Sequence, residues 1–436
     1  MKKVIVLCLC LGLTAQVSLA KQIVVSQRGG GNFTKIQAAI DAATNGDTVV
    51  VRPGVYVENL NFKGKKILVT STLGPDSTSI SGSSPGFSNA GSNSNNFDLS
   101  SVVSFVSGED SASILKGFTI MNGAGTFIPF AGGIRIGGGI LCNGTAPTIW
   151  GNIIRDNKAD DGAGIECTQG SNPKIQYNLI WRNVASTANP NFISSGGGIT
   201  AAFGSSPQII NNTIVGNECL TGGGGVSSLF PGSNPILRNN IIFNNRGGGI
   251  FAEVGGAAMV RYCDVFSNPS TTLGDYHNAS CAAGCISVFP NFVDPTNGNF
   301  RLQANSPCIN AGDPTEKDPD GTRRDMGAFI FDIRTAVAAS LNTPFEYQLM
   351  QNYPNPFNPE TAIRFVVPQA SHVNVTIYNL RGETIRQLVS KNYAAGAHVL
   401  SWDGRDDSGR QAASGVYLYQ IRTNDYSATQ RMLLLR

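Results

Sequence analysis

Charged side chains are scarce in this chain. Asp, Glu, Lys and Arg make up 14% of its 436 residues, against about 25% in an average soluble domain. Helical bundles and coiled coils depend on such residues, so the composition argues against them. The formal net charge is +3, and two of these charges, on Lys2 and Lys3, belong to a segment that we expect to be removed. Because no basic run is present, nucleic acid is not an expected partner.

Histidine is also rare, and this limits the chemistry that the chain can support. Only three histidines are present, and His277 is the only one before residue 336. A Ser-His-Asp triad is therefore hard to build in that part of the chain.

Cysteine is present, but it does not form the even set that is typical of a disulfide scaffold. Of nine cysteines, Cys8 and Cys10 lie in the N-terminal apolar run, which leaves seven. We expect Cys281 and Cys285 to pair and close a small loop. The alternative is a metal site made by His277, Cys281 and Cys285.

Long hydrophobic runs are missing after the first twenty residues. Lys2 and Lys3 precede an apolar run at 4–13, and residues 18–20 supply the small residues of a signal-peptidase site. The run is short for a membrane span, and no later stretch approaches 18 apolar residues. We therefore expect residues 1–20 to be a signal peptide and the mature chain to have no transmembrane segment. The expected location is secreted or on the outer cell surface.

Glycine is abundant, at 51 residues, and glycines open each copy of a repeat. Ile or Val follows the glycine, and then come Pro, a hydrophobic residue, Asn, a hydrophobic residue and a second Asn. Successive copies are 26, 34, 28 and 23 residues apart. The first Asn is Asn152, Asn178, Asn212 or Asn240, and the next hydrophobic position holds Ile154, Ile180, Ile214, Ile242 or, in a degenerate fifth copy, Val265.

This spacing is typical of a β-solenoid, in which each coil stacks on the last at about 4.8 Å. We expect the aliphatic column to point inward. The Asn column is expected at a turn, with its amides bonded to the coils above and below. Cys142 and Cys167 fall in a column of small residues, so we expect packing groups there, with an inter-coil disulfide as the alternative. An insertion near 185–194 is expected to leave the wall as a loop.

The region after residue 20 predicts a capped first coil. Residues 32–43 predict one amphipathic helix, which we assign to an N-terminal cap because an open solenoid end exposes unpaired strand groups. The motifs at 36–40 (IQAAI), 46–49 (GDTV) and 53–58 (PGVYVE) resemble the opening coil of right-handed parallel β-helix proteins of the pectate lyase-like superfamily. Motifs between Phe289 and Ala328 resemble the way such secreted proteins end. The resemblance implies an all-β fold, with a right-handed parallel β-helix at 21–333.

A second domain is expected at 346–436, after a linker at 334–345. Short alternating strands separated by glycine turns predict a small Ig-like β-sandwich. This part is similar to the C-terminal sorting domains of the type IX secretion system, which are related to the Ig-like domain of the flagellar hook-capping protein. The similarity implies secretion machinery as a partner and delivery across an outer membrane. The residues that carry it include Asn352, Pro354, Asn355, Pro356, Phe357, Asn358, Pro359, Trp402, Gly415 and Tyr417.

The densest acidic group in the repeats offers the candidates for catalysis. Asp160 and Asp161 fall at an expected turn between coils, with Lys158 beside them. β-Helix enzymes that cleave acidic polysaccharides combine carboxylates that bind Ca²⁺ with a Lys or Arg base. These three residues are the only catalytic candidates, and Ca²⁺ is the only cofactor that such a site would use. The favoured interpretation is instead a polar surface turn without chemistry, and no cofactor is expected.

Outward aromatic residues indicate binding instead. Trp181 and Phe243 stand three residues after a repeat Asn, between inward positions. We expect them to point outward, where an aromatic column could stack sugar rings or dock a partner. The alternative is that the insertion at 185–194 folds over the column and buries it.

Together these patterns favour an exported protein that binds glycan or extracellular matrix without turnover. The alternative function is a polysaccharide lyase or hydrolase with a divergent active site. The choice between these two functions depends on how the charged residues cluster. An enzyme needs acidic and basic side chains that converge in one groove, and the repeats contain only one such cluster.

Overall fold

The computed structural model describes residues 20–82, 100–129, 133–189, 192, 194–219, 221–270, 273–331, 347–349, 351–352, 355–394 and 396–435. Residues 1–19 of the expected signal peptide lie outside the described residues, as do Pro354 and the expected linker at 334–345. The chain divides into two compact units between Phe331 and Asp332. Within the described residues, no helix has the length and apolar character to cross a membrane.

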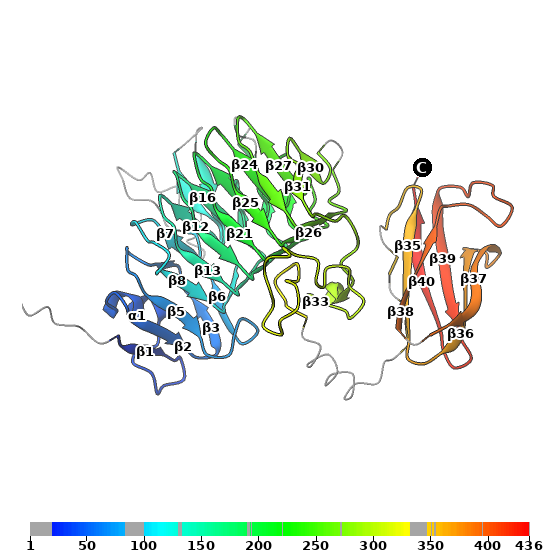
Figure 1. Ribbon diagram of the computed structural model, residues 1–436, viewed down its shortest axis with the longest axis horizontal. Helices are drawn as coiled ribbons and strands as arrows, with labels where there is room; N and C mark the ends of the chain where they lie inside the picture. The colour runs from blue at the N-terminus through cyan, green and yellow to red at the C-terminus, as the bar shows by residue number, and fades with distance from the viewer. Residues whose placement is uncertain are drawn as a thin grey trace, which may run out of the picture. The chain divides into compact units, whose positions relative to one another are not determined.

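Three long parallel sheets form the wall of the first unit (Figure 1). Sheet A runs through β1 (Gln22–Val25), β2 (Thr48–Val51), β5 (Leu68–Ser71), β8 (Ile114–Lys116), β13 (Thr148–Trp150), β17 (Lys174–Gln176), β21 (Gln208–Ile210), β25 (Ile236–Arg238), β28 (Met259–Arg261) and β31 (Cys281–Ala283). Sheet B runs through β3 (Gly54–Val57), β6 (Thr78–Ser81), β9 (Thr119–Met121), β14 (Ile153–Arg155), β18 (Leu179–Trp181), β22 (Thr213–Val215), β26 (Ile241–Phe243) and β29 (Asp264–Phe266). Sheet C runs through β4 (Leu60–Asn61), β7 (Val103–Phe105), β12 (Ile140–Asn143), β16 (Ile165–Thr168), β20 (Ile199–Ala202), β24 (Val226–Leu229), β27 (Ile250–Glu253) and β30 (Tyr276–His277).

Two small sheets accompany the three long ones. A three-stranded parallel sheet contains β15 (Lys158–Ala159), β19 (Val184–Ala185) and β23 (Glu218–Cys219). The antiparallel hairpin of β10 (Thr126–Ile128) and β11 (Ile134–Ile136) lies outside the repeat. The stacked coils confirm the predicted parallel solenoid.

The aliphatic column lies inside the coil, as predicted. Ile154 pairs in register with Ile180, and Ile180 with Ile214. These residues, together with Ile242 and Val265, are fully buried. Burying each such side chain contributes about 1.5 to 3 kcal/mol, so the column is a main source of stability for every coil.

The predicted Asn ladder is present between sheets A and B. The Oδ1 atom of Asn178 accepts from the backbone N and from Nδ2 of Asn152, at 2.9 and 3.1 Å. Its own Nδ2 donates to Ile149 O at 2.9 Å and to Asn212 Oδ1 at 3.0 Å. Each buried amide is thus satisfied by adjacent coils. A second ladder follows sheet B and contains Asn157, Asn183, Asn217, Asn245 and Asn268.

The capping helix α1 (Ile36–Ala42) is shorter than the predicted range of 32–43. Its start is fixed by Glu58, whose carboxylate oxygens accept from the backbone N of Ile36 and Gln37 at 2.9 and 3.0 Å. At the other end, Lys65 Nζ donates to three backbone carbonyls of the last turn at 2.7 Å. A carboxylate at the N-terminus of a helix and an ammonium at its C-terminus both interact favourably with the helix dipole and so stabilise the helix.

Phe192 is a described residue of the insertion near 185–194. It packs against Ile134, Ile136 and Leu141, beside the β10–β11 hairpin and β12. The in-register residues Cys142 and Cys167 are buried free thiols, which agrees with their predicted role in packing.

Residues 289–331, here called the strap, follow the last coil and cover part of sheet B. They contain β32 (Phe292–Asp294), the 3-10 helix η2 (Pro295–Asn297) and β33 (Asn299–Leu302). Thr213 Oγ1 on β22 accepts from Ala328 N at 3.0 Å. Gly327, at φ +94°, lies so close to β26 that an added Cβ would be 2.7 Å from Ile241 Cδ1.

The second unit is the predicted β-sandwich. One antiparallel sheet contains β34 (Gln348–Leu349), β35 (Thr361–Val367) and β38 (Gly396–Trp402). The other contains β37 (Thr384–Tyr393), β36 (Ser371–Asn379), β39 (Gly415–Arg422) and β40 (Ser427–Leu434).

Several residues of the expected sorting motif are structural in this sandwich. Asn352 is buried, its backbone N donates to Tyr419 Oη at 2.6 Å, and its Nδ2 donates to Thr361 Oγ1 at 2.9 Å. Phe357 and Trp402 are core residues as well. By contrast, Asn355, Pro356, Asn358 and Pro359 are exposed.

Candidate functional site

The acidic residues predicted as catalytic are bound into the solenoid wall. Asp160 Oδ2 accepts from Arg135 N at 2.6 Å. Asp161 is 6% exposed, and its Oδ1 accepts from Ser195 Oγ at 2.5 Å and from Thr200 Oγ1 at 2.9 Å. Lys158 is exposed on β15. Asp161 therefore does not lie on an open surface turn, because its carboxylate is buried against neighbouring coils.

A second carboxyl, Glu166, is buried near Asp161 on sheet C. Its Oε2 atom has no hydrogen-bond partner among the described residues. Gly162, at φ +57°, lies directly over it, so that an added Cβ would be 2.3 Å from Oε2. Burial raises the pKa of Asp161 to about 7, and burial together with Asp161 raises the pKa of Glu166 well above its usual value. Both carboxyls are thus held inside the wall.

The cysteines near the end of the solenoid form a disulfide between Cys281 and Cys285. Both sulfurs are used in this bond, so they cannot serve as thiolate ligands of a metal. His277 Nε2 lies 2.9 Å from Glu253 Oε1, and the alternative metal site is not assembled.

The predicted aromatic column points outward from sheet B, but the strap covers it. Phe243 is 5% exposed, and its ring centroid lies 5.4 Å from that of Phe289. The Trp181 ring lies 5.4 Å from Phe300 in an edge-on contact. The expectation of an exposed column is therefore wrong. The covering residues are Phe289 and Phe300 of the strap, whereas Phe192 of the insertion packs against Ile134, Ile136 and Leu141.

A cleft of about 940 Å³ remains between the strap and the solenoid. This volume is at the upper end of the range of about 300 to 1,000 Å³ that is usual for ligand sites. On the solenoid side it is lined by Asp76, Trp150, Ile153, Tyr177 and Leu179. On the strap side it is lined by Gly298, Phe300, Arg301, Lys317, Arg324 and Phe329.

An aromatic pair forms the solenoid side of this cleft. Trp150 ends β13, points away from the buried Ile149 and is 38% exposed. The Trp150 and Tyr177 ring centroids are 4.8 Å apart. Tyr177 occupies the turn before the Asn ladder at φ +55°, a region that bulky residues seldom adopt. The turn thus holds the two rings together at the cleft.

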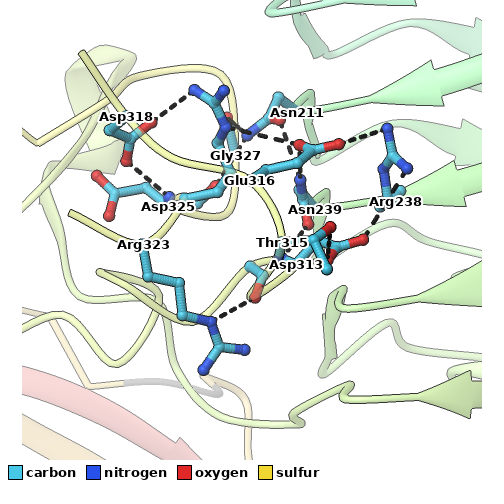
Figure 2. Close-up of polar contacts among 12 residues, drawn as sticks. Asn211, Arg238, Asn239, Asp313, Thr315, Glu316, Asp318, Arg323, Asp325 and Gly327 are labelled. Atoms are coloured by element: carbon cyan, nitrogen blue, oxygen red, sulfur yellow. Dashed lines mark hydrogen bonds and ion pairs between the residues drawn. The ribbon is translucent and has the colours of Figure 1, made fainter. Parts of the chain in front are cut away.

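A polar network holds the strap side in place, as Figure 2 shows. The amide of Asn239 accepts from Asp313 N at 2.7 Å and donates to Glu316 Oε2 at 3.0 Å. Arg238 Nη2 pairs with Glu316 Oε1 at 2.6 Å. Arg324 Nη1 pairs with the buried Asp318 Oδ1 at 2.7 Å. The wall that carries Lys317 and Arg324 is therefore anchored on the solenoid.

Sequence reasoning missed Trp150, although a signal was present. Trp150 is one of only three tryptophans in the chain and stands at an outward position just before a turn glycine, Gly151. The predicted aromatic residues lie in strands after the ladder Asn, whereas Trp150 ends the strand before it. The cleft itself could not be predicted, because the strap is distant in sequence.

Two segments of the chain match known families. Residues 185–286 match the right handed beta helix region. Residues 358–426 match the FlgD Ig-like domain. The first unit is thus a right-handed β-helix, and the second contains an Ig-like domain of the FlgD type. No curated protein matches the sequence.

Among solved structures, the pectin methylesterase from Aspergillus niger is 16% identical, with a TM-score of 0.39, and the match covers 61% of this chain and 87% of that one. Dimeric latent PorU from Porphyromonas gingivalis is 18% identical, with a TM-score of 0.19, and the match covers 20% of this chain. PorZ, a surface component of the type IX secretion system of the same organism, is 20% identical, with a TM-score of 0.16 and 27% of this chain covered. The chain spans only 9% of the PorU chain and 14% of the PorZ chain. At these scores the three structures carry no argument about function.

Proposed function

We propose that this protein is an exported β-helix protein that binds a glycan in the cleft between the solenoid and the strap, without turnover. The observation that carries the proposal is the exposed Trp150 ring, held beside Tyr177 in a cleft large enough for several sugar rings. Aromatic faces of this kind stack on the apolar faces of sugars, and a rigid pair loses little entropy on binding.

The geometry favours binding over the alternative of a lyase or hydrolase. Asp161 is buried and hydrogen-bonded, whereas Lys158 is exposed on β15. A general acid or base needs to reach its substrate within about 3 Å, and the covered Asp161 offers no such approach.

A glycan array followed by calorimetry tests this function. We expect Trp150→Ala to weaken binding of the best array ligand, with ring stacking contributing about 0.5 to 1.5 kcal/mol beyond area burial. Phe203→Ala is the matched control, because Phe203 has the same 38% exposure but does not line the cleft. Equal affinities for the wild type and Trp150→Ala would overturn the proposal. Release of unsaturated sugars by the wild type would instead support the alternative function.

We also propose that the Ig-like unit directs delivery to the outer surface through the type IX secretion machinery. Support comes from the sorting-motif residues in this unit and from its match to the FlgD Ig-like domain. Since Asn352, Phe357 and Trp402 are core residues, the exposed residues Asn358 and Pro359 are better placed to meet a partner.

A further inference from the structure

The strap side of the cleft carries positive charge that the described residues do not neutralise. Arg324 is paired with Asp318 and lies 3.6 Å from Glu316. Arg301 and Lys317 are exposed, and neither forms an ion pair with a described residue. The solenoid side contributes one exposed acid, Asp76. The unpaired groups of the cleft therefore have an excess of positive charge, located on the strap.

The guanidinium of Arg301 lies over an aromatic ring of the strap. Its guanidinium carbon lies 5.1 Å from the centre of the Phe329 ring, and both residues line the cleft. A cation stacked on an aromatic face keeps its edge N–H groups available in the plane of the guanidinium. Those donors match the two oxygens of a carboxylate or the oxygens of a sulfate.

We propose that the ligand of this cleft is an anionic glycan, whose acidic group binds Arg301 and Lys317 while a sugar ring stacks on Trp150. This inference rests on the proposed glycan-binding function and adds the charge of the ligand and the residues that recognise it. Trp150 then supplies affinity for any sugar ring, and the two strap cations distinguish charged from neutral chains.

Three probes separate these contributions in calorimetry with the full chain: oligogalacturonate, its neutral methyl ester and a sulfated galactan oligomer. We expect the double variant Arg301→Ala with Lys317→Ala to weaken binding of an anionic probe about tenfold, since charge-assisted bonds are lost. Its affinity for the methyl ester should stay within about twofold of the wild type. The salt dependence of anionic binding should also decrease, because the cleft would no longer attract the probe by charge.

Two further variants make the result specific. Lys174→Ala with Arg261→Ala removes two exposed cations that do not line the cleft, so it controls for net charge and should bind like the wild type. Arg301→Lys should retain only part of the affinity, because an ammonium lacks the planar pair of donors. The carboxylate and sulfate probes show which acidic group is preferred.

The outcomes distinguish this proposal from the function on which it rests. If the wild type binds the methyl ester as tightly as the anionic probes, with Trp150→Ala weakening all of them, glycan binding holds and the anionic specificity is wrong. The same conclusion follows if the strap double variant loses affinity for charged and neutral probes alike. If the wild type binds none of the three probes and no glycan of the array, both proposals fail.

Discussion

At the scale of single residues, Asp161 joins segments that are far apart in sequence. Its backbone bridges to Ile136 and Ser195, and its carboxylate accepts from Ser195 and Thr200. A buried carboxyl that keeps its proton near neutral pH avoids the cost of a charge in an apolar surrounding. The folded state is therefore sensitive to pH at this position.

We expect the stability of the solenoid to decrease as pH rises. Burial raises the pKa of Asp161 from 3.8 to about 7, so the folded protein binds more protons than the unfolded chain between these values. The free energy of unfolding then falls with pH across this interval, and the stabilising contribution is lost as pH passes the folded-state pKa. Asp161→Asn keeps an oxygen for Ser195 and Thr200 but cannot ionise. The free energy of unfolding of this variant should therefore depend less on pH than that of the wild type.

Urea unfolding at about pH 5 and about pH 8 measures this difference. Asp264, whose pKa burial also raises to about 7, should maintain part of the dependence in the variant. The exposed Asp76 provides the control, because Asp76→Asn should behave like the wild type. An Asp161→Asn variant with the full pH dependence of the wild type contradicts the assignment.

The residues that the sequence made predictable are those whose environment repeats locally. Asn178 and Ile180 are placed by a short pattern that recurs in each coil, and stacking then determines their neighbours. Asp161 follows no such rule, because its partners Ser195 and Thr200 lie 34 and 39 residues away, across the insertion. Its burial depends on how the coils and their loops fit together, which a local pattern does not record.

At the scale of elements, the strap gives a regular solenoid its cleft. The strap covers the aromatic column at Trp181 and Phe243 and leaves Trp150 at the edge. Its own sequence was recognisable as the end of such a protein, but its docking place was not. The contacts that determine that place, such as Asn239 to Asp313 and Asn211 to Asp325, join residues 74 and 114 positions apart.

We expect Asn239→Gly to loosen the strap without unfolding the coils. Asn239 has φ +56°, which glycine adopts without strain, so the substitution removes the amide and spares the turn. The lost bonds to Asp313 and Glu316 are partly buried, so their removal should cost about 0.5 to 1.5 kcal/mol. Limited trypsin digestion should then cleave faster at Arg323 and Lys317.

Asn278→Gly is the matched control for this experiment. Asn278 has φ +49° and is exposed, away from the strap network. Its variant should be digested at the wild-type rate. If the Asn239 variant is no more sensitive than this control, the amide is not what holds the strap, and the ion pair of Arg238 with Glu316 becomes the better candidate.

At the scale of the whole molecule, each unit has its own core. The β-helix is filled by stacked aliphatic residues from Val25 to Val265. The Ig-like unit is filled by a separate cluster that includes Phe365, Trp402 and Tyr419. Because each core is closed within its own unit, neither fold requires the other. This division is consistent with one unit that binds and a second that serves delivery.

We expect deletion of residues 346–436 to leave a folded β-helix that is retained in the periplasm. The β-helix keeps its cap, its ladders and its strap, so circular dichroism of the purified truncated chain should show β structure with a cooperative melt. The glycan affinity of the cleft should be unchanged, since Trp150, Arg301 and Lys317 all belong to the first unit. Cell fractionation should find the full chain at the surface or in the medium and the truncated chain in the periplasm. Normal surface levels of the truncated chain would show that sorting does not depend on the Ig-like unit, whereas an insoluble product would show that the β-helix needs that unit in order to fold.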